Sequence, residues 1–193
     1  GSMFIPWSGL QRNIAQATDT TVRKPETVGQ RIAMNIPGLS TTVPPKLTAL
    51  GEPIERPAGR LGAVFPLAVS TGDSATPVER VMRDVGLKPS IPRTDFTLPE
   101  GVKLTPVEEF AIKEAKGKAA AVALERLISN PNFDRFPPER KKALLKAARD
   151  KAFDQINTLS RTAITRRMRG RPLDPAVYPD HRAKLVQVLG GQQ

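Results

Sequence analysis

Several residue types that carry enzyme chemistry are scarce or missing in this sequence of 193 residues. There is no cysteine, which excludes disulfides, thiolate metal sites and cysteine nucleophiles. His181 is the only histidine, and no serine stands in a Gly-x-Ser-x-Gly context, so an acid–base relay lacks its parts. We expect a surface or capping role for His181, beside a helix start. Glycine loops that cradle nucleotides are absent as well. The sequence therefore predicts a protein that is not an enzyme, with no cofactor and no small-molecule substrate.

Aromatic residues are also few, at 5% of the chain, and hydrophobic residues reach only 39%. We therefore expect a modest core. Recognition of single-stranded nucleic acid usually needs interleaved aromatic side chains, and Arg135-Phe136 is the only basic–aromatic neighbour pair in the charged half. Trp7, the only tryptophan, is expected to be a docking or core residue and not a stacking platform.

Long apolar runs are missing too. No stretch approaches the roughly 18 to 20 apolar residues that a membrane-spanning helix needs. No charged segment followed by an apolar one indicates a secretory signal. Gly1-Ser2 is typical of an expression scar, so residues 1–2 are left out of the fold prediction. The chain fits an excised piece of something longer.

Proline, in contrast, is abundant: twelve of the nineteen prolines precede residue 100. Because proline interrupts long helices and central strands, we predict a Pro-rich arm over 3–104, followed by a basic helical domain over 105–193. Within the arm, residues 37–75 are expected to be extended or polyproline-like chain packed on something. Three short helices are predicted in the arm, over 7–18, over 25–36, and over 77–85 with Thr76 as its cap.

The second half predicts longer helices. Thr105-Pro106-Val107-Glu108 matches a capping box and starts a helix that runs to about Asn130. The longest helix opens at Pro137-Pro138 and closes at Gly170, and its apolar stripe comprises Leu145, Ala148, Ala152, Ile156, Leu159 and Ala163. The two form a hairpin through 130–136, and a last helix covers 179–189. The predicted fold class is mainly α, a C-terminal helical hairpin plus short helices, with an irregular N-terminal half packed on it or extending from it.

Small residues predominate at positions 117–123 of the first long helix, which read Gly117-Lys118-Ala119-Ala120-Ala121-Val122-Ala123. They either let another backbone approach closely, or they are simply good helix formers. The acids of this helix, Glu108, Glu109 and Glu114, are expected to be ordinary surface acids that pair with Lys113 and Lys118, and not metal ligands.

The net charge is +11, and most of the excess lies in residues 138–171, which hold eleven Lys or Arg and three acids. Such a charge attracts polyanions such as DNA or an acidic protein surface. The candidate binding residues are Lys141, Lys142, Lys146, Arg149, Arg161, Arg166, Arg167, Arg169 and Arg171. At 100° per residue the cations do not share one face. A solvated helix with cations near its C-terminal end remains the alternative interpretation.

Several segments of the first half carry a resemblance: Phe4-Ile5-Pro6, Ile14-Ala15-Gln16-Ala17-Thr18-Asp19, Val22-Arg23-Lys24-Pro25, Ile32-Ala33-Met34-Asn35-Ile36-Pro37-Gly38-Leu39-Ser40, Val43-Pro44-Pro45-Lys46-Leu47 and Leu50-Gly51-Glu52-Pro53-Ile54. Together they resemble a domain of the large polyvalent, internal virion proteins of tailed bacteriophages, which are associated with DNA ejection. The resemblance covers roughly residues 4–60 and carries no catalytic motif. It implies a location in the phage virion, or in the host cytoplasm after delivery, and contacts with other virion proteins or a neighbouring subunit.

Two functions of different class follow. The first is a non-catalytic internal virion or ejection-associated module that binds DNA or an acidic protein surface through its basic helices. The alternative is a phage-encoded inhibitor or adaptor that binds a host enzyme with the same helices.

Overall fold

The computed structural model describes residues 23, 25, 28–33, 43–54, 76–99 and 101–191. The chain divides into two compact units, one formed by Gly1–Lys46 and Pro53–Asp73, the other by Leu47–Glu52 and Ser74–Gln193. Within the described residues the regular structure is helical, apart from isolated bridge pairing. This confirms the predicted fold class, with the two long helices in the C-terminal half.

In the first unit, helix α2 spans Val28–Ala33. It lies inside the helix predicted over 25–36, but Pro25 itself is not helical. An antiparallel bridge joins Arg23 to Pro45, and the Arg23 guanidinium donates to the Val43 carbonyl. The helix predicted over 7–18 and residues 34–36 lie outside the described residues.

The first helix of the second unit is α3, Pro77–Asp84, which Thr76 and Glu79 cap reciprocally. Helix α4, Pro106–Ile128, starts with the predicted capping box of Thr105 and Glu108. A short 3-10 turn η3, Phe133–Arg135, leads to α5, Pro138–Met168. Gly170, with φ +67°, follows α5 as the predicted stop. The 3-10 turn η4, Pro175–Val177, and α6, Asp180–Gly190, complete the chain, and α6 begins one residue after the predicted start.

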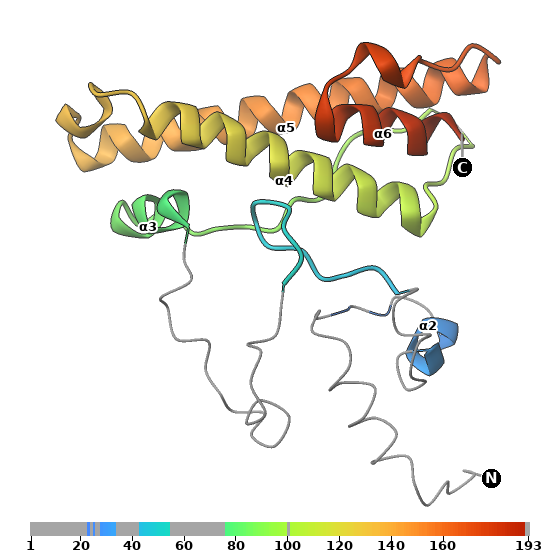
Figure 1. Ribbon diagram of the computed structural model, residues 1–193, viewed down its shortest axis with the longest axis horizontal. Helices are drawn as coiled ribbons and strands as arrows, with labels where there is room; N and C mark the ends of the chain where they lie inside the picture. Colours follow the sequence, from blue (N-terminus) through green and yellow to red (C-terminus); the bar gives the residue numbers. More distant parts are fainter. Residues whose placement is uncertain are drawn as a thin grey trace, which may run out of the picture. The chain divides into compact units, whose positions relative to one another are not determined.

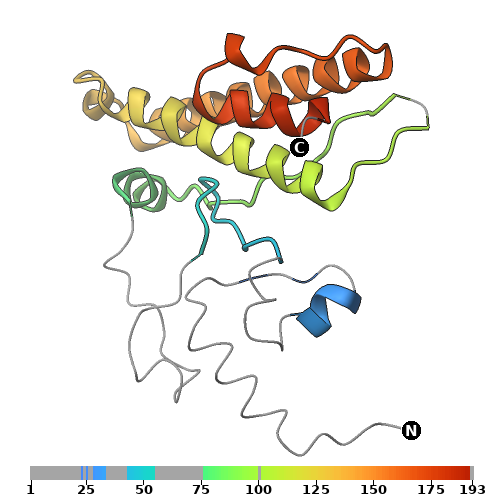
Figure 2. The same cartoon turned by 45° about the vertical axis from the view of Figure 1, so that its right-hand side comes forward.

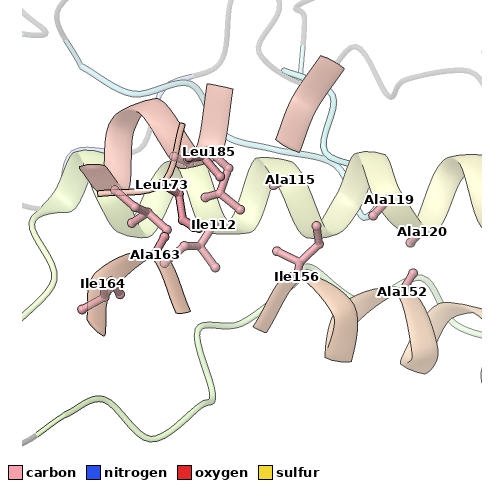
Figure 3. Packing of buried hydrophobic residues seen from close by; sticks show 13 residues of the cluster. Ile112, Ala115, Ala119, Ala120, Ala152, Ile156, Ala163, Ile164, Leu173 and Leu185 are labelled. Carbon is pink, nitrogen blue, oxygen red and sulfur yellow. The ribbon is translucent and has the colours of Figure 1, made fainter. Parts of the chain in front are cut away.

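Helices α4 and α5 lie side by side along most of their length, and α6 packs against both near the end where α4 begins (Figures 1 and 2). Figure 3 shows why: Ile112 of α4 and Ile156 and Ala163 of α5 point into one apolar layer, which Leu185 of α6 closes. The small side chains of both helices, Ala115, Ala119, Ala120 and Ala152, line the same layer. The α4–α5 hairpin predicted from the sequence is therefore confirmed.

A second apolar cluster lies around the opposite end of the hairpin. Val78 and Met82 of α3 pack with Leu124 of α4, Phe133 of η3 and Leu145 of α5. Leu50 and Leu87 belong to the same cluster. The helical unit therefore includes residues on both sides of the boundary predicted at 104/105, because the apolar face of α3 needs the long helices to cover it.

The loop 47–52 meets α4 at the small-residue segment. A Cβ atom on Gly117 would overlap the backbone nitrogen and Cα of Gly51. Conversely, a Cβ on Gly51 would lie 2.6 Å from the Glu114 carbonyl oxygen and 2.9 Å from the Lys118 nitrogen. Of the two interpretations of this segment, close backbone approach is the one that applies at Gly117.

Candidate functional site

The predicted site residues all lie on α5 or just after it, but they fall into two groups. Lys146, Arg161, Arg166, Arg169 and Arg171 are exposed. Within the part of the chain that the structure describes, none of these five forms an ion pair. Their charges are therefore available to a partner in solution.

Three predicted site residues are instead engaged with the protein itself. Arg149 donates two hydrogen bonds, of 3.1 and 3.0 Å, to the carboxylate of Asp150. Lys141 lies 3.9 Å from a carboxylate oxygen of Asp134 and 5.6 Å from the centre of the Phe133 ring. These two side chains are held locally and contribute less to a binding surface than sequence reasoning predicts.

The third, Arg167, forms an ion pair with Glu108 at the start of α4. This contact ties the last turn of α5 to the first turn of α4. Burial raises the pKa of Glu108, but hydrogen bonds from the Thr105 N–H, the Arg167 guanidinium and the Thr105 hydroxyl outweigh it, so the pKa lies below its usual value. Arg167 is a structural residue in this arrangement. Lys142, the remaining predicted cation, is half-buried beside Gly86.

The prediction that Glu108 and Glu114 are ordinary surface acids is wrong. Their exposed fractions are 5% and 9%. Glu114 accepts from Lys118, its predicted partner, and from Lys184 of α6, at 2.8 and 2.9 Å. Burial raises the pKa of Glu114, but the two lysines outweigh it and hold it below its usual value. The reason for the error is that α6 and the end of α5 cover these positions, which the pattern of one helix does not reveal.

Lys116 is a buried cation that sequence reasoning missed. Its exposed fraction is 1%, and its amino group donates to the Arg93 carbonyl and, at 2.8 Å, to the Asp95 carboxylate. The hydrogen bond from Lys116 lowers the pKa of Asp95. Lys116 stands four residues after Ile112 and four before Ala120, both apolar, and this spacing is the signal that could have indicated its burial.

The cations of α5 that sequence reasoning left out of the site are Arg140 and Lys151, both exposed. Arg140 lies 4.6 Å from the centre of the Phe136 ring. At 100° per residue, Lys151 stands opposite the buried stripe and shares its side of α5 with Arg140 and Arg169. We call this side the outer face of α5; its exposed members are Arg140, Ala143, Ala147, Lys151, Asp154, Gln155, Thr158, Arg161, Thr162, Arg166 and Arg169.

The outer face carries five cations and one acid, Asp154. Its exposed members include no apolar side chain larger than alanine, but half-buried Leu144 lies on the same side, and exposed Met168 stands at the end of the helix. The hydroxyls of Thr158 and Thr162 donate to carbonyl oxygens of α5, and the Gln155 amide oxygen accepts from Arg182. Chemically, this is a surface that offers positive charge and little else.

His181 is half-buried near the start of α6. Its Nε2 atom is buried and has no hydrogen-bond partner. Burial, together with the neighbouring Arg182 charge, lowers its pKa. The expected surface or capping role is not what the structure shows, because the ring packs into the unit with one nitrogen unsatisfied.

Among the described residues, no group of three or more His, Asp or Glu side chains is placed to hold a metal ion. No described helix is long and apolar enough to span a membrane. Comparisons with protein-family models, with curated proteins and with solved structures find no match to this chain.

Proposed function

We propose that this chain is a non-catalytic interaction module that binds an anionic partner through the exposed cations of α5. The observation that carries the proposal is the outer face together with Arg171. Arg161, Arg166 and Arg169 have no described carboxylate beside them, whereas Glu108 and Glu114 elsewhere in the unit are each matched with a basic partner. Exposed arginines without an ion-pair partner cost the fold little free energy because water solvates them. They form charge-assisted hydrogen bonds when an anion replaces that water.

The setting follows from the resemblance of residues 4–60 to domains of the large internal virion proteins of tailed bacteriophages. In that setting the module is carried in the particle, and its partner is DNA or the acidic surface of another virion protein. The host-enzyme inhibitor is the alternative, and the two differ in location. Mass spectrometry of purified particles finds a virion module among the particle proteins and does not find a free inhibitor.

Binding itself is tested with two anionic polymers at about 50 mM salt, where phosphate contacts are strong. DNA stands for the nucleic-acid partner, and polyglutamate stands for an acidic protein surface. We expect the full chain to bind at least one of them, and we expect the affinity to fall when Lys151, Arg166 and Arg169 are all replaced with Gln. The proposal is contradicted if neither polymer binds, or if the substitutions leave binding unchanged.

A further inference from the structure

We infer that the anionic partner is a double-stranded nucleic acid, held by its phosphates along the outer face of α5 and without recognition of base sequence. This inference rests on the proposed function and names the partner for the same surface. It is carried by three features of the outer face: its composition, its length, and the state of its hydrogen-bonding groups.

Composition separates nucleic acid from an acidic protein. The central part of a protein–protein interface is depleted of charged residues and enriched in aromatic side chains and methionine. The exposed members of the outer face have the opposite character, with cations from Arg140 to Arg169 and alanine as the only exposed apolar residue; Leu144, on the same side, is half-buried. Protein surfaces that bind nucleic acid are more polar and much more positively charged than protein–protein interfaces. The composition therefore favours phosphates over an acidic protein surface.

Length favours a duplex. Helix α5 is a single helix of 31 residues, and Arg140 and Arg169 stand about 44 Å apart along it at 1.5 Å per residue. A duplex presents one phosphate charge per about 1.7 Å of its axis on a stiff rod. A helix of this length can therefore meet phosphates near both of its ends without deforming the nucleic acid.

The aromatic side chains argue against a single strand. Binding of single strands relies on exposed aromatic platforms on which bases stack. The described aromatic residues are Phe96, Phe110, Phe133, Phe136, Phe153 and Tyr178, and each of them is buried or half-buried. Phe136, beside the outer face, is already covered by the Arg140 guanidinium. The described chain thus offers no platform for stacking.

The hydrogen-bonding groups argue against base recognition. Base edges are read by amide, hydroxyl and guanidinium groups that enter a groove. On the outer face, the hydroxyls of Thr158 and Thr162 donate to α5 carbonyls, and the Gln155 amide oxygen accepts from Arg182. The donors that remain are the Gln155 NH2 group and the exposed cations, and we infer that the cations bind backbone phosphates, which carry no sequence information.

The test measures binding of the full chain to labelled 24-base-pair duplexes by fluorescence anisotropy. Two duplexes are DNA with unrelated sequences and different base compositions, and a third is RNA. The matching single strands are measured in the same way. We expect each duplex to bind several-fold more tightly than its single strands, and the two DNA sequences to agree within about twofold. Tighter binding of single strands, or a difference above tenfold between the DNA sequences, overturns the inference.

Two variants of equal net charge locate the contact. The outer-face variant carries Lys151→Gln, Arg166→Gln and Arg169→Gln. The control variant carries Lys88→Gln, Lys103→Gln and Arg126→Gln, three exposed cations that are not on α5. We expect the outer-face variant to lose at least about tenfold in duplex affinity and the control to lose less than about threefold, since distant charges are screened. Equal losses contradict the inference.

Replacing Asp154 provides a test that misfolding cannot mimic, because the substitution is expected to raise duplex affinity. It is the one acid on the outer face and is exposed. Asp154→Asn removes a negative charge from the path of the phosphates, and we expect duplex affinity to rise about two- to threefold. If polyglutamate responds to these variants and duplexes do not, the inference fails while the proposed function stands. If neither polymer binds, both fail.

Discussion

Gly51 and Gly117 lie backbone against backbone, so the loop 47–52 rests directly on α4. A Cβ on Gly117 would overlap atoms of Gly51, and Gly51 has a φ of +77°, which side chains other than glycine rarely adopt. Two glycines far apart in the sequence thus serve one contact. This contact places Leu50 in the cluster that holds α3 against the hairpin.

The first prediction concerns this contact. In an open helix position, Gly→Ala stabilises by about 1 kcal/mol. At Gly117 the added methyl group meets backbone that cannot move aside, and overpacking of this kind costs about 1 to 3 kcal/mol. We expect Gly117→Ala to lower the free energy of unfolding in urea by about 1 to 2 kcal/mol. Gly190→Ala, near the end of α6 with its nearest neighbour at 3.9 Å, is the matched control and should be neutral or stabilising. A Gly117→Ala protein as stable as the original would show that the loop does not rest on α4.

The second prediction separates the two partners of Lys116. The amino group is buried, whereas the exposed fraction of the Asp95 side chain is 69%. Lys116→Met keeps the length of the side chain but leaves the Arg93 carbonyl without its donor, which costs about 1 to 3 kcal/mol. Asp95→Asn removes only an exposed charge and should cost less than about 1 kcal/mol. Urea unfolding measures the loss of unfolding free energy in each variant. Equal losses would show that Lys116 stabilises the fold through its ion pair with Asp95 and not through the buried hydrogen bond to Arg93.

The third prediction uses pH to isolate Glu108. Its pKa in the folded protein lies below the reference value of 4.5. The ionised carboxylate therefore stabilises the fold above about pH 4.5, and this contribution is lost as the pH falls through the lowered pKa. We expect Glu108→Gln, which can keep the capping contact, to be less stable than the original chain at pH 7 by about 1 to 2 kcal/mol. The difference should shrink as the pH falls below about 4.5 and through the lowered pKa. A difference in stability that does not change with pH would mean that the negative charge of Glu108 adds nothing to its contact with Arg167.

The fourth prediction concerns His181. Its pKa is lowered by burial first and by the Arg182 charge second, and its surroundings also include Asp180, Lys118 and Glu114. Because the folded-state pKa lies below 6.5, protons bind more readily to the unfolded chain, and stability falls as the pH drops below about 6.5. His181→Gln should flatten the profile of unfolding free energy between pH 7.5 and 5.5. An unchanged profile would assign that pH dependence to other groups.

Local patterns in the sequence predict much of this fold. The capping boxes at Thr76 and Thr105, the stop at Gly170 and the apolar stripe of α5 depend on neighbours within a few residues, and the structure has them where the pattern places them. What the sequence does not reveal is which surfaces meet. Burial of Glu108 and Lys116, and the meeting of Gly51 with Gly117, depend on segments brought together only by folding.

The candidate site shows the same division. Sequence reasoning places the excess charge on α5, and the exposed arginines at its end agree with that placement. It cannot tell that Arg167 is tied to Glu108, because this pair crosses between helices, whereas Arg149 pairs with its sequence neighbour Asp150. It also omits Lys151, although the predicted apolar stripe already puts Lys151 on the side of α5 away from the core.

The measurement that tests the central claim most directly is the salt dependence of duplex binding by the original chain and by the outer-face variant. The logarithm of the binding constant should fall linearly with the logarithm of salt concentration, with a slope of about −0.9 for each phosphate contact. We predict that the variant, with three cations fewer on α5, has a slope shallower by about 2 to 3, while the control variant keeps nearly the original slope. Identical slopes for all three proteins would contradict the claim that the outer face of α5 is where the partner binds.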